Sequence, residues 1–226
     1  MPELVYLAGI EQNPNYHHKN VLEHTLLVVE HCPATPMMRW AGLLHDIGKP
    51  LTFIVTNTGI HFYNHEDLGS KMANDIAIRL RFSTSDRMLL TQLIQYHMRP
   101  NLYNSKWGDE AIRRLKRECG SFLSELLALS RADCTSMRVD KIEAAIASIN
   151  ELEQRLAKEP EPLNKCPLNG HDIIYVLNID EGPLVGRIQK YIMKKIEAGD
   201  VKPDNYEALW DLAKKKLEEL ENEGLS

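Results

Sequence analysis

The sequence predicts an all-α protein: a helical bundle with one small β-hairpin and a C-terminal helical appendage. Apolar residues recur at helical spacing along most of the 226 residues. One short run rich in β-branched and aromatic residues, 51–63, is interrupted by Asn57-Thr58-Gly59 and is typical of a hairpin. A proline-rich segment over 160–167 interrupts the helical pattern. We therefore expect a bundle domain over 1–159, a linker over 160–167, and a helical segment over 168–226 packed on or beside the bundle.

The first two helices are delimited by an N-cap, a proline and a glycine. Asn20 is a suitable N-cap for a helix over 21–31, and Pro33 ends that helix. The next helix is expected over 37–47, because Gly48 and the proline two residues later cannot continue it.

Beyond the hairpin, the same apolar spacing predicts helices separated by polar and proline-containing breaks. Arg99-Pro100-Asn101 is expected to end one of them. The expected ranges are 66–82, 85–97, 109–118, 121–137, 141–158, a short helix near His171, 183–198 and 205–223.

Composition argues against several classes of protein. The net charge of -5 disfavours broad, unspecific nucleic-acid binding, which needs a basic field. No apolar run approaches the ~20 residues of a membrane span. The four cysteines have no Cys-x-x-Cys spacing, and we find no secretory signal. We therefore expect reduced thiols in a cytoplasmic protein.

The dipeptide His45-Asp46 brings an imidazole and a carboxylate into an apolar stretch. Apolar surroundings tolerate such groups only when they are hydrogen-bonded, paired or bound to metal. His24 precedes the pair and Asp133 follows it, each in its own apolar or amphipathic stretch. Imidazole and carboxylate together suit Mn, Fe, Ni, Co or Zn. For an isolated His-Asp pair, the alternative is a core histidine satisfied by a neighbouring carboxylate.

Six blocks of sequence in a fixed order carry a family resemblance. In this order they resemble the HD-domain metal-dependent phosphohydrolase superfamily, and within it the HD domain of bacterial CCA-adding tRNA nucleotidyltransferases. The resemblance implies that His24, His45, Asp46 and Asp133 hold a metal on a helical bundle. The blocks are Leu7–His17, the segment around His24, Leu43–Pro50, Phe62–Gly69, Tyr96–Pro100 and Arg131–Asp133, and two later segments, Pro167–Asp172 and Gly182–Ile188, resemble the tail of the same enzymes.

His65 and His97 lie in two of these blocks. Two-metal members of the superfamily use additional histidines at about these places. The resemblance therefore implies one or two divalent ions, drawn from Mn, Ni, Co, Fe, Mg or Zn, with Asp46 bridging the metals or orienting the nucleophile. The alternative is that both histidines bind substrate phosphate or cap helices.

Several cationic side chains and one further histidine are candidates for contacting substrate. Lys49 follows His45-Asp46 and Arg99 follows His97, and both are expected to neutralise phosphate oxygens during catalysis. For Lys49, the alternative is a solvated lysine at a helix end. Arg113 and Arg114 belong to a basic cluster that either steers a nucleotide towards the metal or forms a solvated face. His17 lies in a matched block and is expected to line the mouth of the site.

The second His-Asp dipeptide, His171-Asp172, lacks a buried apolar helix around it. It is interpreted as the start of a helix and not as a metal site.

The resemblance implies a phosphodiesterase or phosphatase that acts on nucleotides or RNA ends, such as 2′,3′-cyclic phosphates or 2′-nucleotides. A 5′-nucleotidase or a cyclic (di)nucleotide hydrolase is one alternative, and a non-catalytic module that binds tRNA or a protein is another. A Gly-Ser motif followed by Asp-x-Asp, which would hold a nucleoside triphosphate, is missing. CCA addition is therefore not expected, and the chain is interpreted as an HD module without a nucleotidyltransferase head.

Overall fold

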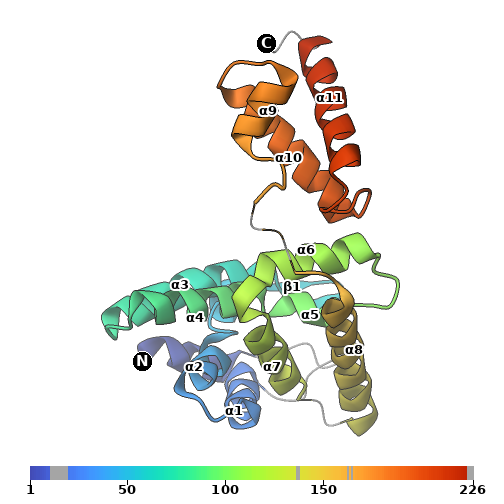
Figure 1. Ribbon diagram of the computed structural model, residues 1–226. Coiled ribbons are helices and arrows are strands. Elements are labelled where there is room, and N and C mark those ends of the chain that lie inside the picture. The colour runs from blue at the N-terminus through green and yellow to red at the C-terminus, as the bar shows by residue number, and fades with distance from the viewer. Residues whose placement is uncertain (11–19, 136–137, 162, 164, 223–226) are drawn as a thin grey trace. The chain divides into compact units, whose positions relative to one another are not determined.

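The computed structural model describes residues 1–10, 20–135, 138–161, 163 and 165–222. The described residues form helices and a single two-stranded antiparallel sheet, so the predicted all-α class with one hairpin is confirmed (Figure 1). The chain divides into two compact units. The first comprises Met1–Trp107 and Cys119–Lys158, and the second comprises Gly108–Glu118 and Glu159–Ser226. Among the described residues, no helix is both long and apolar enough to cross a membrane.

The first unit is a bundle in which α7 contacts α1, α2, α4, α5 and α8 (Figure 1). Helices α1 and α2 also pack against each other, as do α3 and α4. The helices are α1 Val21–His31, α2 Pro36–Leu44, α3 His65–Arg79, α4 Thr84–Tyr96, α5 Met98–Asn101, α7 Leu123–Asp133 and α8 Val139–Lys158, with 3-10 turns η1 Pro2–Gly9, η2 Lys49–Leu51 and η3 Gly120–Phe122.

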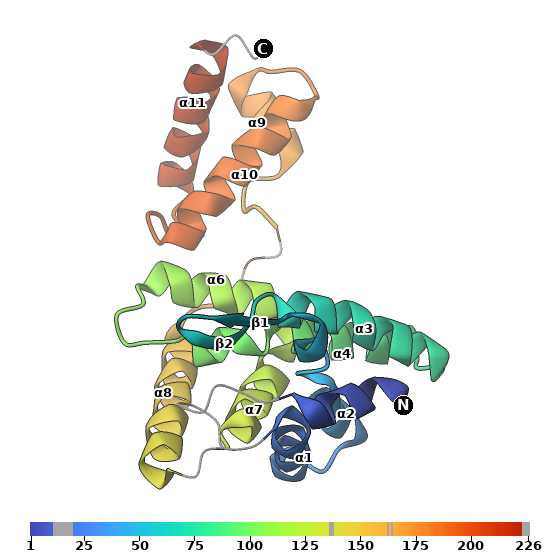
Figure 2. The same ribbon diagram turned by 180° about the vertical axis from the view of Figure 1, so that it is seen from behind.

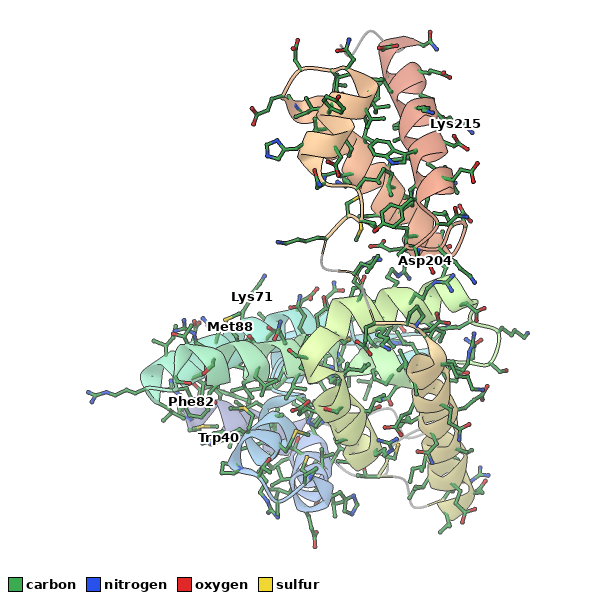
Figure 3. All side chains as sticks on the ribbon, in the orientation of Figure 1. Trp40, Lys71, Phe82, Met88, Asp204 and Lys215 are labelled. Atoms are coloured by element: carbon green, nitrogen blue, oxygen red, sulfur yellow. The ribbon has the colours of Figure 1, made fainter. Side chains whose placement is uncertain are left out.

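Fully buried aliphatic side chains from these helices form the core of the bundle, including Leu44, Leu90, Leu93, Leu126 and Leu129. At its periphery, the Trp40 ring of α2 meets the Phe82 ring edge-on, with 5.4 Å between ring centroids (Figure 3).

Side-chain caps begin three of these helices. The Asn20 side chain accepts a hydrogen bond from the Glu23 N–H at 2.9 Å, which confirms the predicted cap of α1. Thr35 caps α2 and Ser83 caps α4 in the same way. These bonds satisfy N–H groups that have no partner within the helix.

The hairpin pairs β1, Phe53–Thr56, with β2, Gly59–Phe62 (Figure 2). Phe53 lies opposite Phe62, and Thr56 lies opposite Gly59. Gly59 has a φ of 120°, a conformation that favours glycine at the turn. The hairpin predicted within 51–63 is therefore confirmed.

Four helices, α2, α3, α4 and α7, end sooner than predicted. At the ends of α2 and α4, a histidine side chain bonds to a backbone carbonyl. Helix α2 stops at Leu44, and His45 Nδ1 donates to the Gly42 carbonyl at 2.8 Å. In a continuing helix, that carbonyl would accept from the N–H of Asp46. Helix α4 likewise stops one residue before His97, and the expected stop at 99–101 is the short helix α5.

The second unit has its own hydrophobic core, in which α10 packs against both α9 and α11. Its helices are α6 Asp109–Cys119 (whose last residue belongs to the first unit), α9 Gly170–Leu177, α10 Pro183–Ala198 and α11 Tyr206–Asn222. Its buried core residues include Ile173, Ile188, Ile192 and Leu209. The predicted division into 1–159, 160–167 and 168–226 stays a prediction, and it differs from these units in residues 108–118.

Candidate metal centre

Six potential ligands converge in the first unit from segments far apart in the sequence. His24 lies in the first turn of α1, and the other ligands also lie at or beside helix termini. Four of them, His24, His45, Asp46 and His97, are at most 2% exposed, and His65 is 6% exposed. Helix ends place these side chains in the interior of the bundle.

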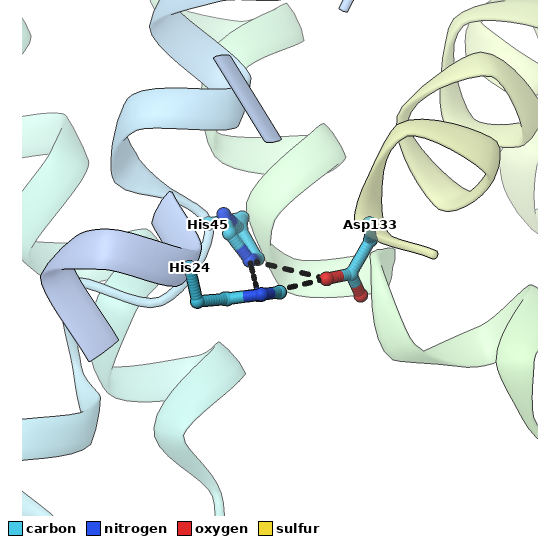
Figure 4. A group of neighbouring side chains, drawn as sticks. All are labelled: His24, His45 and Asp133. Atoms are coloured by element: carbon cyan, nitrogen blue, oxygen red, sulfur yellow. Dashed lines mark hydrogen bonds and ion pairs between the residues drawn. The ribbon is translucent and has the colours of Figure 1, made fainter. Parts of the chain in front are cut away.

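One group of donors consists of His24, His45 and Asp133 (Figure 4). Asp133 Oδ1 lies 2.9 Å from His24 Nε2 and 3.6 Å from His45 Nε2. The two Nε2 atoms are 3.3 Å apart. One ligand atom from each residue therefore faces a common point.

A second group consists of Asp46, His65 and His97. The Nε2 atoms of His65 and His97 are 3.3 Å apart, and Asp46 Oδ1 lies 3.4 Å and 3.9 Å from them. The other oxygen of Asp46, Oδ2, faces the first group, at 3.2 Å from His45 Nε2 and 3.5 Å from His24 Nε2. Asp46 therefore offers one oxygen to each group.

Backbone carbonyls fix the orientation of three imidazole rings. The Nδ1 atoms of His45, His65 and His97 lie 2.8, 2.8 and 2.6 Å from carbonyl oxygens three residues earlier in the chain. A carbonyl only accepts, so each Nδ1 carries a hydrogen, and each ring in its neutral form directs its Nε2 lone pair into the centre. Lone pairs 3.3 Å apart repel unless a proton or a cation lies between them. The donor set therefore fits a divalent metal, as imidazole and carboxylate groups do elsewhere.

Electrostatics in the centre favour a bound cation. Burial opposes charge on His45, but the neighbouring Asp46 and Asp133 outweigh it and raise the pKa of His45 to about 10. Burial, assisted by the charge on His45, lowers the pKa of His97 to about 4. Burial would raise the pKa of Asp46, but His45 and Lys49 hold it well below its usual range. Both carboxylates stay ionised, and a proton on His45 occupies the place that a cation would take.

Lys49 brings a permanent positive charge to the edge of the centre. Its Nζ lies 2.7 Å from Asp46 Oδ2 and 5.3 Å from the centroid of the Phe62 ring. The side chain is only 10% exposed. Lys49 is the first residue of η2, which directly follows the turn that carries Asp46.

Gly48 lets this turn approach α3 closely enough to join the two groups. A Cβ atom at this position would lie 2.2 Å from the His65 carbonyl oxygen and 2.8 Å from the Gly69 backbone nitrogen. Both contacts are far shorter than real Cβ contacts, and both involve backbone atoms. Only glycine therefore fits here without displacing the helix that carries His65.

The ligands open onto a cavity of about 650 Å³. Five of the six potential ligands and Lys49 line one part of it, and mainly apolar side chains line the rest. These further lining residues are Ile60, His61 and Phe62 of the hairpin, Met98, Pro100 and Asn101 of α5, Cys134, and Ala145, Ser148 and Ile149 of α8. The cavity has room for a phosphate ester with a sizeable organic group beside the ligands.

Three of the other predicted substrate contacts, Arg99, Arg113 and Arg114, are not among the described residues that line this cavity. The Arg99 guanidinium lies over the Tyr96 ring, with its Cζ atom 5.8 Å from the ring centroid. Arg113 belongs to the second unit, where it donates to the Glu197 and Ala198 carbonyls at the end of α10. Arg114 is exposed in that unit. His17 lies outside the described residues.

The second His-Asp dipeptide begins α9, as predicted. His171 and Asp172 are both exposed, and the Asp172 N–H donates to the capping side chain of Asn169 at 2.8 Å. Within the described residues, the two groups of potential metal ligands do not include this pair.

Polar side chains that were not predicted also contact the ligands. Glu66 Oε2 lies 3.3 Å from His65 Nδ1. Thr135 Oγ1 lies 2.8 Å from His24 Nδ1, and Asn101 Nδ2 donates to Asp133 Oδ2 at 3.2 Å. Thr135 stands two residues after Asp133, which is a weak signal. Asn101 stands 32 residues before its partner, and no local pattern predicts that contact.

Comparison with known proteins gives one family match and several relatives. Residues 20–145 match the family model described as HD domain. The chain is 29% identical over 212 residues to an A-adding tRNA nucleotidyltransferase of Deinococcus radiodurans, covering 89% of this chain and 48% of that protein. It is 30% identical over 210 residues to a CC-adding tRNA nucleotidyltransferase of Thermus thermophilus, covering 89% and 46%. A multifunctional CCA protein of Ralstonia nicotianae is 35% identical over 127 residues, covering 53% and 28%. The chain spans about half the length of the first two relatives.

Proposed function

The chain belongs to the HD domain family, a superfamily of metal-dependent phosphohydrolases, and on that premise we propose that it hydrolyses phosphate esters of nucleotides or RNA ends. We propose 2′,3′-cyclic phosphates and 2′-nucleotides as the first substrates. The observation that carries the proposal is the placement of Asp46, whose two oxygens face two different groups of histidines. This arrangement suits a pair of divalent ions that share one carboxylate.

Two such ions, held by His24, His45 and Asp133 on one side and by His65 and His97 on the other, would polarise a phosphoryl oxygen and activate water. Asp46 would bridge them. Which of Mn, Ni, Co, Fe, Mg or Zn is bound stays open, and the nitrogen-rich donor set favours the transition metals over Mg.

The chain's own residues supply orientation and charge. Lys49 places an ammonium group at the edge of the centre, where it would offset negative charge that develops on a phosphoryl group. The low pKa of His97 keeps that ring neutral and able to act as a ligand at ordinary pH. The apolar part of the cavity would exclude water from the organic part of the substrate.

Transfer RNA is a further proposed partner, because the printed names of the first relatives identify them as tRNA nucleotidyltransferases. On this proposal, a tRNA 3′ end is among the RNA ends that the cavity receives. The alternatives are a 5′-nucleotidase, a cyclic (di)nucleotide hydrolase and a non-catalytic tRNA-binding module, and they give different results in the same experiment.

The test is phosphate release or ring opening from 2′,3′-cyclic, 2′-, 3′- and 5′-nucleotides and cyclic dinucleotides, with each metal supplied in turn. Asp46→Asn preserves the size of the side chain and removes its charge, and it should abolish turnover. Asp172→Asn makes the same change in the exposed His-Asp dipeptide of α9 and should leave turnover unchanged. Equal activity in wild type and Asp46→Asn would refute the proposal. Tight tRNA binding without turnover under any metal would favour the binding module.

A further inference from the structure

The two donor groups differ in what orients their ligands. Both histidines of the second group donate Nδ1 to backbone carbonyls, and His65 Nδ1 also lies 3.3 Å from Glu66 Oε2. In the first group, side chains orient two of the three ligands: Thr135 contacts His24, and Asn101 contacts Asp133. Side chains can be exchanged by substitution without altering the backbone, so the origin of this difference is testable.

Asn101 fixes the orientation of the Asp133 carboxylate. Its Nδ2 donates to Asp133 Oδ2 at 3.2 Å, and its Oδ1 accepts from the buried hydroxyl of Ser130. A carboxylate only accepts, so the amide can have only this orientation. Ser130 and Asp133 lie on α7 and Asn101 on α5, so the amide links the two helices. Asp133 Oδ1 is thereby left facing His24 and His45.

The Thr135 hydroxyl can pair with His24 Nδ1 in two ways. A hydroxyl can donate or accept, whereas a carbonyl can only accept. When the Thr135 hydroxyl donates to Nδ1, His24 carries its hydrogen on Nε2 and donates to Asp133 Oδ1 at 2.9 Å. When the hydroxyl accepts, the hydrogen lies on Nδ1, and the Nε2 lone pair faces the centre.

We propose that Asn101 and Thr135 are positioning residues that set the metal affinity of the His24–His45–Asp133 group. Asn101 presents one oxygen of Asp133, and Thr135 lets His24 move its hydrogen from Nε2 to Nδ1 as a cation binds. This exchange leaves the net charge of the His24 ring unchanged, because one proton leaves Nε2 for water and another reaches Nδ1 from water. This inference rests on the metal dependence of the proposed function and adds to it two residues outside the ligand set.

The binding test uses the full chain and titrates Zn²⁺ or Mn²⁺ against a competing chelator. Thr135→Val removes the hydroxyl at nearly constant volume, and Asn101→Ala removes the amide. Each should weaken one binding step by about 10- to 100-fold, the usual effect of losing an outer hydrogen bond to a ligand, and leave the other step nearly unchanged. Thr135→Ser keeps the hydroxyl and should stay close to wild type. A general loss of folding would weaken both binding steps together. Unfolding of the variants in the presence of chelator measures their stability separately.

The tautomer of His24 gives a second readout that needs no turnover. Imidazole ¹⁵N spectra should show the His24 hydrogen on Nε2 in chelator and on Nδ1 with Zn²⁺, and Thr135→Val should weaken that response. Wild-type binding of both ions by Thr135→Val and Asn101→Ala would overturn the inference, as would an unchanged His24 tautomer or a wild type that binds no metal. If affinity and tautomer respond as expected but no nucleotide is hydrolysed, the positioning role stands and the proposed function fails.

Discussion

His45, His65 and His97 each donate Nδ1 to a carbonyl three residues earlier, which leaves only Nε2 for ligation. This local bond decides the tautomer before any partner is considered. The Nδ1 atom of His24 contacts the Thr135 hydroxyl, which can donate or accept. The four imidazoles therefore differ in how rigidly they are prepared for a cation.

The metal-free protein should be most stable near pH 6.5 as far as His45 and His97 are concerned. The pKa of His97 falls from 6.5 to about 4, so the unfolded chain binds a proton between these values that the folded chain does not. Stability from His97 is therefore lost as pH falls through this window. The pKa of His45 rises to about 10, so its contribution is lost as pH rises from 6.5 through 10.

The measurement is urea unfolding in chelator across this pH range. His97→Asn keeps a donor for the Ile94 carbonyl and removes the titrating ring, so stability should depend less on pH on the acid side. A variant whose acid-side slope equals that of wild type would contradict the assignment to His97.

Lys49→Met should separate metal binding from turnover. The substitution removes the ammonium group 2.7 Å from Asp46 Oδ2, so metal affinity should stay the same or rise, because a competing cation is gone. Turnover should fall by about 10²- to 10³-fold if Lys49 offsets charge on the phosphoryl group. Chelator competition gives the affinity and steady-state kinetics give kcat. Unchanged kcat would show that Lys49 only pairs with Asp46.

At the residue scale, the ordered sequence blocks that resemble HD domains indicated all six potential ligands. The apolar or amphipathic stretches around several of them also implied that these polar groups have partners. The structure brings the six together, and their role as metal ligands stays a prediction. The substrate contacts were less predictable. Arg113 bonds to carbonyls at the end of α10, and the partner of such a bond leaves no pattern in the sequence.

At the scale of elements, apolar periodicity predicted α1 as 21–31 and α10 as 183–198, which are the observed bounds. It placed the end of α2 three residues too late. The His45 ring competes for a helical carbonyl, and periodicity carries no information on such competition. The departure falls at the proposed ligands, where local rules give way to the needs of a site.

Gly48→Ala should disturb the junction between the turn and α3. Its new Cβ would clash with the His65 carbonyl oxygen and the Gly69 nitrogen, so α3 must move. We expect a loss of about 1–3 kcal/mol in the free energy of unfolding and weaker metal binding by the Asp46–His65–His97 group. Urea unfolding and chelator competition measure the two effects.

The matched control is Gly186→Ala in α10, where a Cβ would have no heavy atom within 4 Å. Because glycine is a poor helix former, this change should stabilise the protein by up to about 1 kcal/mol. If Gly48→Ala were as stable as the control, the close approach would not constrain the turn.

At the scale of the whole molecule, the chain contains two compact units, and all six potential ligands belong to the first. A bound cation should therefore stabilise one unit selectively, by about 2.7 kcal/mol at a free concentration 100 times Kd. Hydrogen exchange with and without Zn²⁺ measures this effect by segment. Protection should rise in α1, α3, α4 and α7 and stay constant in α9, α10 and α11. Equal gains in both sets would contradict placement of the site in the first unit alone.

The prolines at 160–167 predict a boundary there, and this stays a prediction. The second compact unit comprises residues 108–118 and 159–226. The sequence pattern does not indicate that residues 108–118 group with that unit. Lys116 donates to the Glu159 carbonyl, and Arg113 donates to carbonyls 84 and 85 residues later. Long-range bonds to main-chain oxygens depend on the folded backbone, so side-chain patterns do not predict them.

The bond from each ring to the preceding turn has a consequence for how the centre assembles. His45, His65 and His97 are each oriented by a residue three positions away, so we expect each segment to favour its ligand direction before distant segments meet. Folding then has to dock segments whose Nε2 atoms are already oriented for ligation. A cation present at that stage would act as a template that brings these segments together. The cost in side-chain entropy would be small, because the ligands are already oriented.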